Sequence, residues 1–442
     1  MRSLAVSQPA FNRIWKSLVE RSNLEPTRVR RDALTLRAFG RPVSVRQAVE
    51  VICREVRAQG DRALIKYVRH LEGAALTPGR LKLTAAERAA AEKRLTHAQR
   101  RALRECAEHI RAFHEAQKPR FAAAVKRPGV GVSELCRPLQ RAGIYVPGGN
   151  APLVSTVLMN ALPAAVAGVP EIIMATPARA DGSIADALVA AANLAGVKTI
   201  FRLGGAVAVA AMAYGTQSVP KADKIVGPGN IFVTEAKRQV VGDVGIDHLA
   251  GPSEILIVAD DSASPEALVW DLLGQCEHGS GAAALLLTPS RRLLQSVQAS
   301  LAALGRENSA WLKIGAHATL IQTSSLAEAL RLANEYGPEH LSLQCRRAQA
   351  CLKDITSAGA IFIGTDTPQA LGDFTAGPNH VLPTGGTCRW ASPLSVRDFL
   401  HYTSLVAYTR AGVDREGEAA VLVAETEGLT AHAQSIRVRM GA

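Results

Sequence analysis

From Gly143 onward the chain alternates short apolar runs with helical segments, and several of the runs end in glycine. Three runs end in this way: Gly143–Val146 before Gly148-Gly149, Thr199–Leu203 before Gly204-Gly205, and Lys224–Val226 before Gly227-Pro228-Gly229. Strands and helices that alternate over short loops form βαβ units, which build parallel sheets covered by helices. The pattern therefore predicts an α/β fold.

The length of 442 residues predicts more than one domain, because single cores stop growing near about 250–300 residues. A second alternating block begins at Glu254–Ala259, and the segments 11–118 and 395–426 have helical periodicity, with 80–116 as one long helix and 396–408 as another. We expect two Rossmann-like parallel-sheet domains with small helical domains at both ends. The expected boundaries are 1–38 for an N-terminal helical arm, 39–142 with 253–394 for a discontinuous first α/β domain, 143–252 for a second, and 395–442 for a C-terminal helical domain.

Composition narrows the class of protein. The net charge of +12 is compatible with nucleic-acid binding, but the arginines are mixed with glutamates and form no basic run interleaved with aromatic residues. We therefore expect no nucleic-acid partner. The chain has no run of about 18 apolar residues that would span a membrane, and its basic N-terminus lacks the apolar core of a signal peptide. Seven cysteines without a C-x-x-C pair indicate a reducing compartment, the cytoplasm.

Four polar stretches carry side chains suited to metal binding and proton transfer. They are Gln275–His278, Glu339-His340, Asp373 with His380, and Glu427 with His432. Four of the eleven histidines lie in these stretches, and an enzyme core has little structural use for so many. Adjacent glutamate and histidine suit paired proton transfer. A metal and acid–base site is the leading interpretation.

Each stretch also has an ordinary structural explanation. Gln275 and His278 lie one helical turn apart, yet a histidine also suits a helix C-terminus through the dipole. Asp373 fits a turn, and His432 fits an exposed helix face. The glycine turns allow a nucleotide to approach the carboxyl ends of strands, but no G-x-G-x-x-G fingerprint demands one.

Taken in order, these segments resemble the histidinol dehydrogenase family from about Val49 to Val438. The stretches that carry the resemblance are Gly143–Gly149, Val157–Asn160, Lys224–Asn230, Glu235–Arg238, Ala250–Glu254, Pro338–Leu341, Gly372–Thr384 and Glu427–His432. The resemblance implies oxidation of L-histidinol to L-histidine through a held aldehyde, with transfer of four electrons to NAD. It also implies one Zn²⁺ per subunit and a homodimer whose C-terminal domains reach into the partner's site.

The resemblance further implies a role for particular residues. Glu339 and His340 would accept protons, and the zinc ligands would be Gln275, His278, Asp373 and His432. Contacts to the substrate would come from these four ligands together with Ser253, His340, His380 and Glu427. Contacts to NAD would come from Tyr145 and Asn230, on the 143–252 domain.

The chain departs from the family pattern at a few positions. Val207 stands where the family has a glutamine that contacts the cofactor, and valine cannot form that hydrogen bond. Leu153-Val154 and His401-Tyr402 replace Tyr-Pro and Lys-Arg. These changes leave open a family paralogue that oxidises a different polar primary alcohol with NAD.

Overall fold

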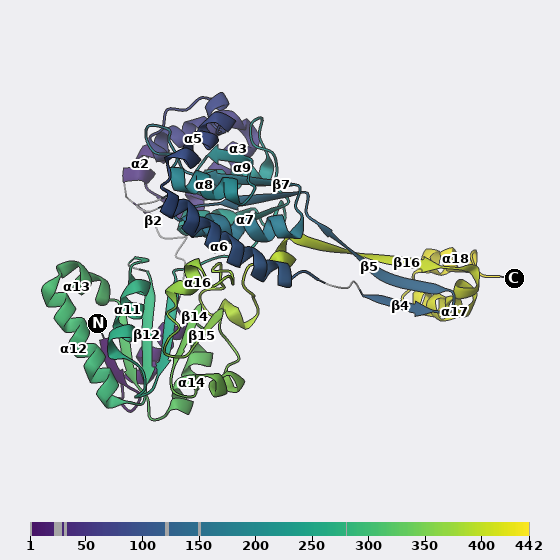
Figure 1. Cartoon of the computed structure of the whole chain (residues 1–442). Helices are drawn as coiled ribbons and strands as arrows, with labels where there is room; N and C mark the ends of the chain where they lie inside the picture. Colours follow the sequence, from purple (N-terminus) through teal and green to yellow (C-terminus); the bar gives the residue numbers. More distant parts are fainter. Residues whose placement is uncertain are drawn as a thin grey trace.

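The computed structural model describes residues 2–21, 29–30, 33–119, 123–148, 152–279 and 281–441. Gly149 of the first glycine turn and part of the N-terminal arm lie outside these residues. The described chain forms two α/β bodies and a projecting arm (Figure 1). The predicted fold class of two parallel-sheet domains is confirmed.

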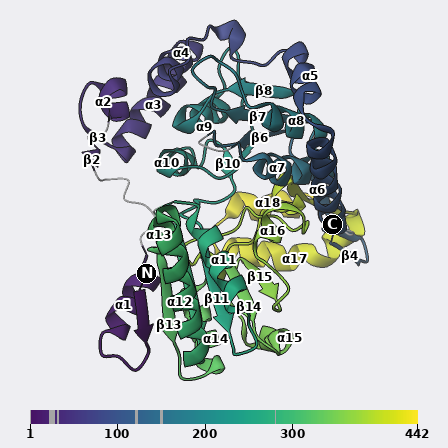
Figure 2. The same ribbon diagram turned by 60° about the vertical axis from the view of Figure 1, so that its left-hand side comes forward.

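The first body, green in Figure 1, is built on a six-stranded parallel sheet in the order β1-β13-β12-β11-β14-β15. Its strands are β1 (Arg2–Ala5), β11 (Glu254–Ala259), β12 (Ala283–Thr288), β13 (Ala318–Gln322), β14 (His340–Gln344) and β15 (Ala360–Ile363). The two middle strands, β11 and β12, are almost entirely apolar, as expected for a sheet buried on both faces. One face packs against α11 and α12 and the other against α1 and α14, as Figure 2 shows from the side.

The helices of this body are short to medium in length. They are α1 (Phe11–Val19), α11 (Pro265–Cys276), α12 (Arg291–Glu307), α13 (Ser309–Gly315), α14 (Leu326–Tyr336), α15 (Ala348–Cys351) and α16 (Ala370–Phe374), with η3 (Leu352–Asp354) and η4 (Thr387–Arg389). Ser264 caps α11 by accepting a hydrogen bond from the Ala267 N–H. Gly337 ends α14 in the left-handed conformation, which turns the chain directly into Pro338-Glu339.

The second body carries a five-stranded parallel sheet in the order β10-β9-β6-β7-β8. Its strands are β6 (Arg141–Tyr145), β7 (Glu171–Thr176), β8 (Thr199–Arg202), β9 (Lys224–Val226) and β10 (Gly245–Ile246). Its helices are α2 (Ala33–Phe39), α3 (Val45–Gln59), α4 (Asp61–Tyr67), η1 (Val68–Glu72), η2 (Pro78–Arg80), α5 (Ala85–Arg94), α6 (His97–Ala116), α7 (Val154–Ala167), α8 (Asp186–Leu194), α9 (Gly205–Tyr214) and α10 (Ile231–Gln239). A two-stranded pair, β2 (Val29–Arg30) with β3 (Val43–Ser44), lies at its edge.

The predicted grouping of 39–142 with 253–394 is wrong. Val49, Leu64 and their neighbours on α3 and α4 share a core with Phe201 of β8, and Ile110 of α6 shares one with Leu158 of α7. These helices therefore cover the five-stranded sheet, because their apolar faces match its surface and not that of the other sheet. The predicted helical arm 1–38 also needs correction, since its first residues form β1, which pairs with β13 at the sheet edge.

Two further predictions fail for local reasons. The expected helix 80–116 is two helices, because Thr84 and Thr96 each form a capping box that starts a new one. The expected helix 396–408 is a short 3₁₀ turn, η5 (Val396–Phe399), followed by strand β16 (Leu400–Tyr408). Its antiparallel partner is β5 (Val130–Pro138), which pairs in turn with β4 (Ala124–Arg127).

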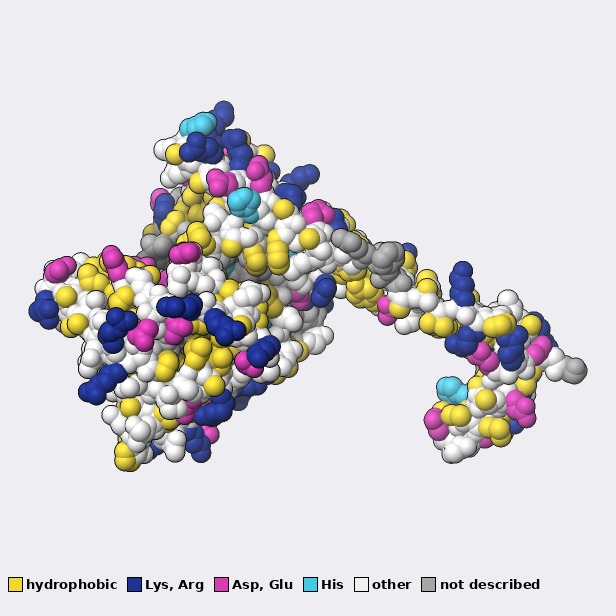
Figure 3. All heavy atoms as spheres, turned by 60° about the horizontal axis from the view of Figure 1, so that its bottom comes forward, with side chains coloured by type: hydrophobic (Ala, Val, Ile, Leu, Met, Phe, Trp, Pro, Cys, Tyr) yellow, Lys and Arg dark blue, Asp and Glu magenta, His cyan; other side chains and the backbone are white. Residues whose placement is uncertain are grey.

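The arm consists of this three-stranded sheet with α17 (Arg410–Thr426) and α18 (Thr430–Arg437). It stands away from both bodies, and Figure 3 shows hydrophobic side chains scattered over its surface. Val406 is 64% exposed and Leu422 is 58% exposed, while the buried hydrophobic cluster between the helices consists of Val421, Ala424 and Ala433. The predicted C-terminal domain is therefore partly a sheet, and it recruits residues 124–138. No helix among the described residues has both the length and the apolar character needed to cross a membrane.

Candidate active site

The predicted proton-transfer pair lies at the amino end of β14, next to the amino end of the neighbouring strand β11. His340 is the first residue of β14, and Glu254 is the first residue of β11. Because β11 and β14 are parallel neighbours, Glu339 and Ser253, which precede them, meet at the same edge. The turn at Gly337 and the register of this strand pair therefore bring together groups that lie far apart in the sequence.

The Glu339 carboxylate is buried, with 6% of the residue exposed. Its Oε2 accepts hydrogen bonds from the Ser253 hydroxyl at 2.7 Å and from the Glu254 N–H at 2.8 Å. Burial raises the pKa of Glu339 to about 7, although the His340 ring and the two hydrogen bonds favour the charged form. A carboxyl with this pKa can both release and accept a proton near neutral pH.

The His340 ring is held in one orientation. Its Nδ1 lies 2.8 Å from the Glu254 carbonyl oxygen, to which it donates, and 3.5 Å from Glu339 Oε2. In the neutral ring, donation through Nδ1 leaves Nε2 as the nitrogen able to accept a proton. That Nε2 lies 3.9 Å from Asp373 Oδ1.

Asp373 and His380 lie directly beside His340. Asp373 Oδ2 accepts a hydrogen bond from Gln369 Nε2 at 2.8 Å, and its Oδ1 is 4.0 Å from His380 Nδ1. His380 Nδ1 also donates to the Asp373 backbone carbonyl at 3.0 Å. Burial lowers the pKa of His380, the neighbouring His340 and His278 lower it further, and Asp373 partly offsets these effects. His380 therefore presents a neutral Nε2.

Gln275 lies in the last turn of α11, and His278 lies just after this helix ends. Gln275 is 1% exposed, and neither its amide oxygen nor its amide nitrogen has a hydrogen-bond partner. An unsatisfied buried amide costs about 1–3 kcal/mol, and both polar atoms of this side chain could accept a partner. His278 is exposed, and it lies near enough to His380 to contribute to the lowered pKa of that ring.

The set within one chain is incomplete as a metal site. Among the described residues, no three His, Cys, Asp or Glu side chains are grouped so that they could hold a metal ion. Glu427 and His432 lie together on the arm, where they line a cavity of about 700 Å³ against α17 and α18. Figure 1 shows this arm far from β14, so the structure does not bring these two residues to the site of their own chain.

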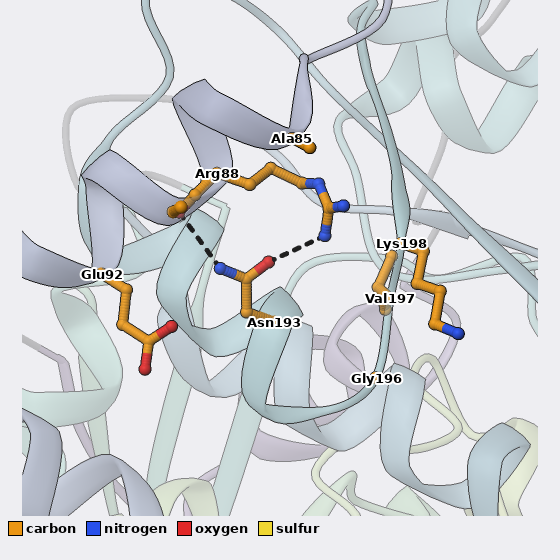
Figure 4. Close-up of a pocket in the computed structure, with 8 residues that line it drawn as sticks. Ala85, Arg88, Glu92, Asn193, Gly196, Val197 and Lys198 are labelled. Atoms are coloured by element: carbon orange, nitrogen blue, oxygen red, sulfur yellow. Dashed lines mark hydrogen bonds between the residues drawn. The ribbon is translucent and has the colours of Figure 1, made fainter.

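A cavity of about 500 Å³ opens in front of the cluster. His340, Asp373 and His380 line one side, and Phe113 and Gln117 at the end of α6 line the other. The cavity therefore lies between the two bodies. A separate cavity of about 400 Å³ lies between α5 and α8 and contains none of the predicted residues. Figure 4 shows Arg88 and Asn193 there, joined by two hydrogen bonds of 3.2 Å that clamp the helices together.

The predicted cofactor residues lie at the carboxyl edge of the five-stranded sheet. Tyr145 ends β6, and its hydroxyl accepts a hydrogen bond from the Gly205 N–H at 3.1 Å. Asn230 is the N-cap of α10, with its Oδ1 accepting from Phe232 N and Val233 N. Val207 requires a correction: it is 1% exposed, inside the core between α3, α9 and the sheet, and offers no surface to a cofactor.

Glu72 links two turns at this same edge. Its Oε1 accepts from the Gly204 N–H at 2.8 Å, and its Oε2 accepts from the Ala178 N–H at 3.0 Å. Burial raises the pKa of Glu72 to about 7, and the two backbone hydrogen bonds lower it in part. A single carboxylate thus ties the turn after β7 to the turn after β8.

Comparisons with known proteins decide the family. The family model described as histidinol dehydrogenase matches residues 37–440. The chain belongs to the histidinol dehydrogenase family. It is 46% identical to the histidinol dehydrogenase of Syntrophotalea carbinolica over 412 residues, which cover 92% of this chain and 95% of that relative. It is 45% identical to that of Deinococcus radiodurans over 408 residues, covering 91% and 92%.

A solved structure agrees with this assignment. The histidinol dehydrogenase of Elizabethkingia anophelis matches with a TM-score of 0.87 at 34% sequence identity, covering 99% of this chain and 98% of that chain. The predicted family is therefore confirmed over nearly the whole length. In this histidinol dehydrogenase family member, the alternating strands and helices form both parallel sheets.

Sequence reasoning missed several residues that surround the predicted ones in this histidinol dehydrogenase family member. Glu254 contacts both predicted proton-transfer residues through its backbone, Gln369 donates a hydrogen bond to Asp373, and Glu72 holds the turns near Tyr145. Each is an isolated polar residue in an ordinary sequence context. For Glu254, its place as the only charged residue of the buried run Glu254–Ala259 was the available signal.

Proposed function

We propose that this protein oxidises L-histidinol to L-histidine through histidinal, in the last steps of histidine biosynthesis, with NAD as electron acceptor and one zinc ion per subunit. The observation that carries the proposal is the cluster of Glu339, His340, Asp373 and His380. Family membership over residues 37–440 supports the same activity.

The donors present fit a zinc ion. Gln275, His278 and Asp373 of one subunit would hold it together with the partner subunit's His432, which gives two imidazole nitrogens and two oxygens. The unpaired Gln275 amide supports this assignment, because a metal ligand would remove its desolvation cost. When bound, zinc positions the imidazole and amine of the substrate. Ser253, His380 and the partner subunit's Glu427 would complete the substrate contacts together with His340.

His340 accepts the proton of the substrate alcohol in the first oxidation. The Glu254 carbonyl fixes Nδ1 as the donor nitrogen, so Nε2 is free to receive this proton. The cavity in front of this nitrogen lies between the two bodies, where a substrate can meet groups from both.

Glu339 acts in the second oxidation. Its carboxylate takes a proton from the water that adds to the aldehyde carbon, which forms the hydrate needed for the second oxidation. Ser253 and the Glu254 N–H bind one oxygen of this carboxylate and leave the other free. The raised pKa makes the group a base of the correct strength near neutral pH.

The carboxyl edge of the five-stranded sheet would bind the dinucleotide. NAD accepts a hydride in each oxidation. Tyr145 and Asn230 border this edge, and the Gly204-Gly205 turn lets a backbone approach a phosphate. Val207 lies in the core behind the turn, so any contact of this turn with the dinucleotide comes from backbone atoms.

A homodimer with exchanged arms accounts for the position of Glu427 and His432. An arm with β16 exposed along most of its length and few buried residues of its own has too little core to be stable alone. Docking on a second subunit would bury these apolar side chains and supply the missing metal ligand. The seven free thiols favour the cytoplasm as the site of action.

Steady-state assay of the zinc-loaded protein tests the proposed activity. We expect two NADH for each histidinol consumed, because both oxidations take place before release. Absence of turnover by the zinc-loaded dimer would reject the proposal. A panel of polar primary alcohols tests the paralogue alternative, which is supported if the protein prefers an alcohol without an imidazole group.

Replacing His278 by asparagine is expected to lower the zinc content of the purified protein by at least about tenfold, since one of two imidazole ligands is lost. The measurement is the zinc content, determined by mass spectrometry after dialysis against a buffer that contains free zinc. The matched control is His317→Asn, which changes an exposed histidine on the same body. Unchanged zinc in His278→Asn would remove this residue from the ligand set.

Replacing Glu72 by glutamine is expected to weaken NAD binding by about tenfold. The glutamine amide nitrogen is a donor, so it cannot accept the hydrogen bond from the N–H of either Gly204 or Ala178 and leaves one turn unheld. In the wild type, NAD affinity should fall as the pH is lowered through about 7, where Glu72 gains a proton and one backbone N–H loses its acceptor. Titration calorimetry with NAD at several pH values measures both effects. Glu50→Gln on the exposed face of α3 is the control, and an unchanged pH dependence in Glu72→Gln would contradict the role.

A further inference from the structure

A buried ion pair joins the N-terminal arm to the strand beside the active site. Arg21, just after α1, places its Nε 2.5 Å from Glu254 Oε1 and its Nη2 2.8 Å from Glu254 Oε2. The side chains are 13% and 2% exposed. The guanidinium lies over the Tyr336 ring, 3.6 Å from its centroid. A two-pronged contact of this kind fixes orientation as well as charge.

The same guanidinium also holds the turn that leads into Glu339. Arg21 Nη1 donates to the Tyr336 carbonyl at 3.1 Å, and Nη2 donates to the Gly337 carbonyl at 3.3 Å. These carbonyls belong to the end of α14 and its left-handed cap. Arg21 therefore contacts β11 through Glu254 and the chain before β14 through this turn.

Glu254 is the residue through which both proton-transfer groups are held. Its N–H donates to Glu339 Oε2 at 2.8 Å, and its carbonyl accepts from His340 Nδ1 at 2.8 Å. Displacement of this one peptide would move the Glu339 carboxylate and release the His340 ring. The Gly385 N–H also donates to Glu254 Oε1, at 3.2 Å, but it carries no charge.

Arg21 is the cation that balances a buried negative charge here. The carboxylate of Glu254 raises the pKa of Glu339, and the other titratable groups that face Glu339 are His340, which lowers it, and Tyr336. Without Arg21 this carboxylate would be a buried charge without a counter-ion, which is strongly unfavourable. The side chain would then move toward water or bind a proton.

We propose that Arg21 is a positioning residue of the active site: through Glu254 it sets the placement of Glu339 and His340, so the N-terminal arm is part of the catalytic apparatus. This inference rests on the proposed function for the roles of the latter two residues. Arg21 itself does not line the cavity in front of His340.

A purely structural role for the N-terminal segment is the competing explanation. This segment is anchored independently, because β1 pairs with β13 and the Phe11 and Trp15 side chains are buried in the core. If Arg21 only added to this anchoring, its loss would lower the melting temperature and leave the kinetics of each folded subunit unchanged.

The test compares full-length, zinc-loaded Arg21→Gln, Arg21→Lys and Arg21→Gln/Glu254→Gln with the wild type. We expect Arg21→Gln to lower kcat of aldehyde oxidation by about 100-fold per folded subunit, with a small change in KM for NAD. Lysine restores the positive charge but cannot contact both Glu254 oxygens at once, so Arg21→Lys should recover part of the rate. Arg13→Gln, on the exposed face of α1, is the matched control.

A second measurement does not depend on substrate. Infrared difference spectra, assigned with Glu339→Gln, follow the protonation of the Glu339 carboxyl, whose midpoint is expected near about 7 in the wild type. In Arg21→Gln this midpoint should move upward, and in the double variant it should return toward the wild-type value. An unchanged midpoint together with unchanged kcat would overturn the inference, even if the melting temperature falls.

The two proposals fail in distinguishable ways. If the wild type does not oxidise histidinol, the proposed activity is rejected, while the infrared titration still decides whether Arg21 controls Glu339. If Arg21→Gln does not fold, Arg21→Lys carries the test, because it keeps the buried charge paired. Wild-type kinetics together with an unshifted midpoint in Arg21→Lys would then overturn the inference.

Discussion

Replacing Glu339 by glutamine is expected to slow aldehyde oxidation by about 10²- to 10⁴-fold, and alcohol oxidation by much less. Glutamine has the same shape and can still accept one hydrogen bond from Ser253 or Glu254, but it cannot take a proton from water. In the proposed mechanism the first oxidation uses His340, whose contact with the Glu254 carbonyl does not involve the Glu339 side chain. Initial rates measured separately with histidinol and with histidinal give the two effects.

The pH dependence provides a second check on the same residue. Burial raises the pKa of Glu339 to about 7, so the carboxylate form needed for the second oxidation increases as the pH rises through that value. Wild-type aldehyde oxidation should rise over this range, and Glu339→Gln should lack the rise. Glu335→Gln, on the exposed end of α14, is the control. Equal losses in both oxidations would contradict the division of roles.

Two inactive variants are expected to restore each other's activity when mixed. His278→Asn damages the site of its own chain, whereas His432→Asn would damage the site of the partner. In a heterodimer of the two, one site contains both substitutions and the other contains neither. Random reassortment of a two-fold dimer should therefore return about a quarter of the wild-type sites.

The experiment requires unfolding and refolding the two variants together, followed by zinc analysis and histidinol turnover. Each variant refolded alone is the control for recovery, and both should stay inactive. A mixture that remains inactive while forming dimers would show that His432 does not serve the partner's site. Activity of His432→Asn alone would remove it from the ligand set.

The sheets could be predicted from the sequence because their strands are buried parallel runs. Residues such as Ile255–Ala259 are apolar on both faces and are bounded by polar or glycine residues, so their pattern is local. Strand β16 was missed because it is exposed and its partner β5 lies far away in the chain, although its Tyr, Thr and Val residues favour a strand. The break at Leu95-Thr96 was missed because its capping box is a short local signal inside a long helical pattern.

Contacts within the candidate site could be read from the residue pattern only where the residues are adjacent. Glu339 and His340 are neighbours in the sequence, and the structure holds them within 3.5 Å. The contact between Arg21 and Glu254 spans 233 positions, and no periodicity connects a residue after α1 to the first residue of β11. Glu72 was equally hidden, because its partners are backbone N–H groups at Ala178 and Gly204, whose identity leaves no trace in the sequence.

The arm is built from two distant parts of the chain, since β4 and β5 precede the first strand of the five-stranded sheet and β16 follows the last strand of the other. During synthesis on the ribosome, the hairpin of β4 and β5 emerges long before the strand that completes it. Until then β5 has an open edge that can pair with the same hairpin of another nascent chain. We therefore expect C-terminal truncation, which removes β16, to cause aggregation as well as loss of activity.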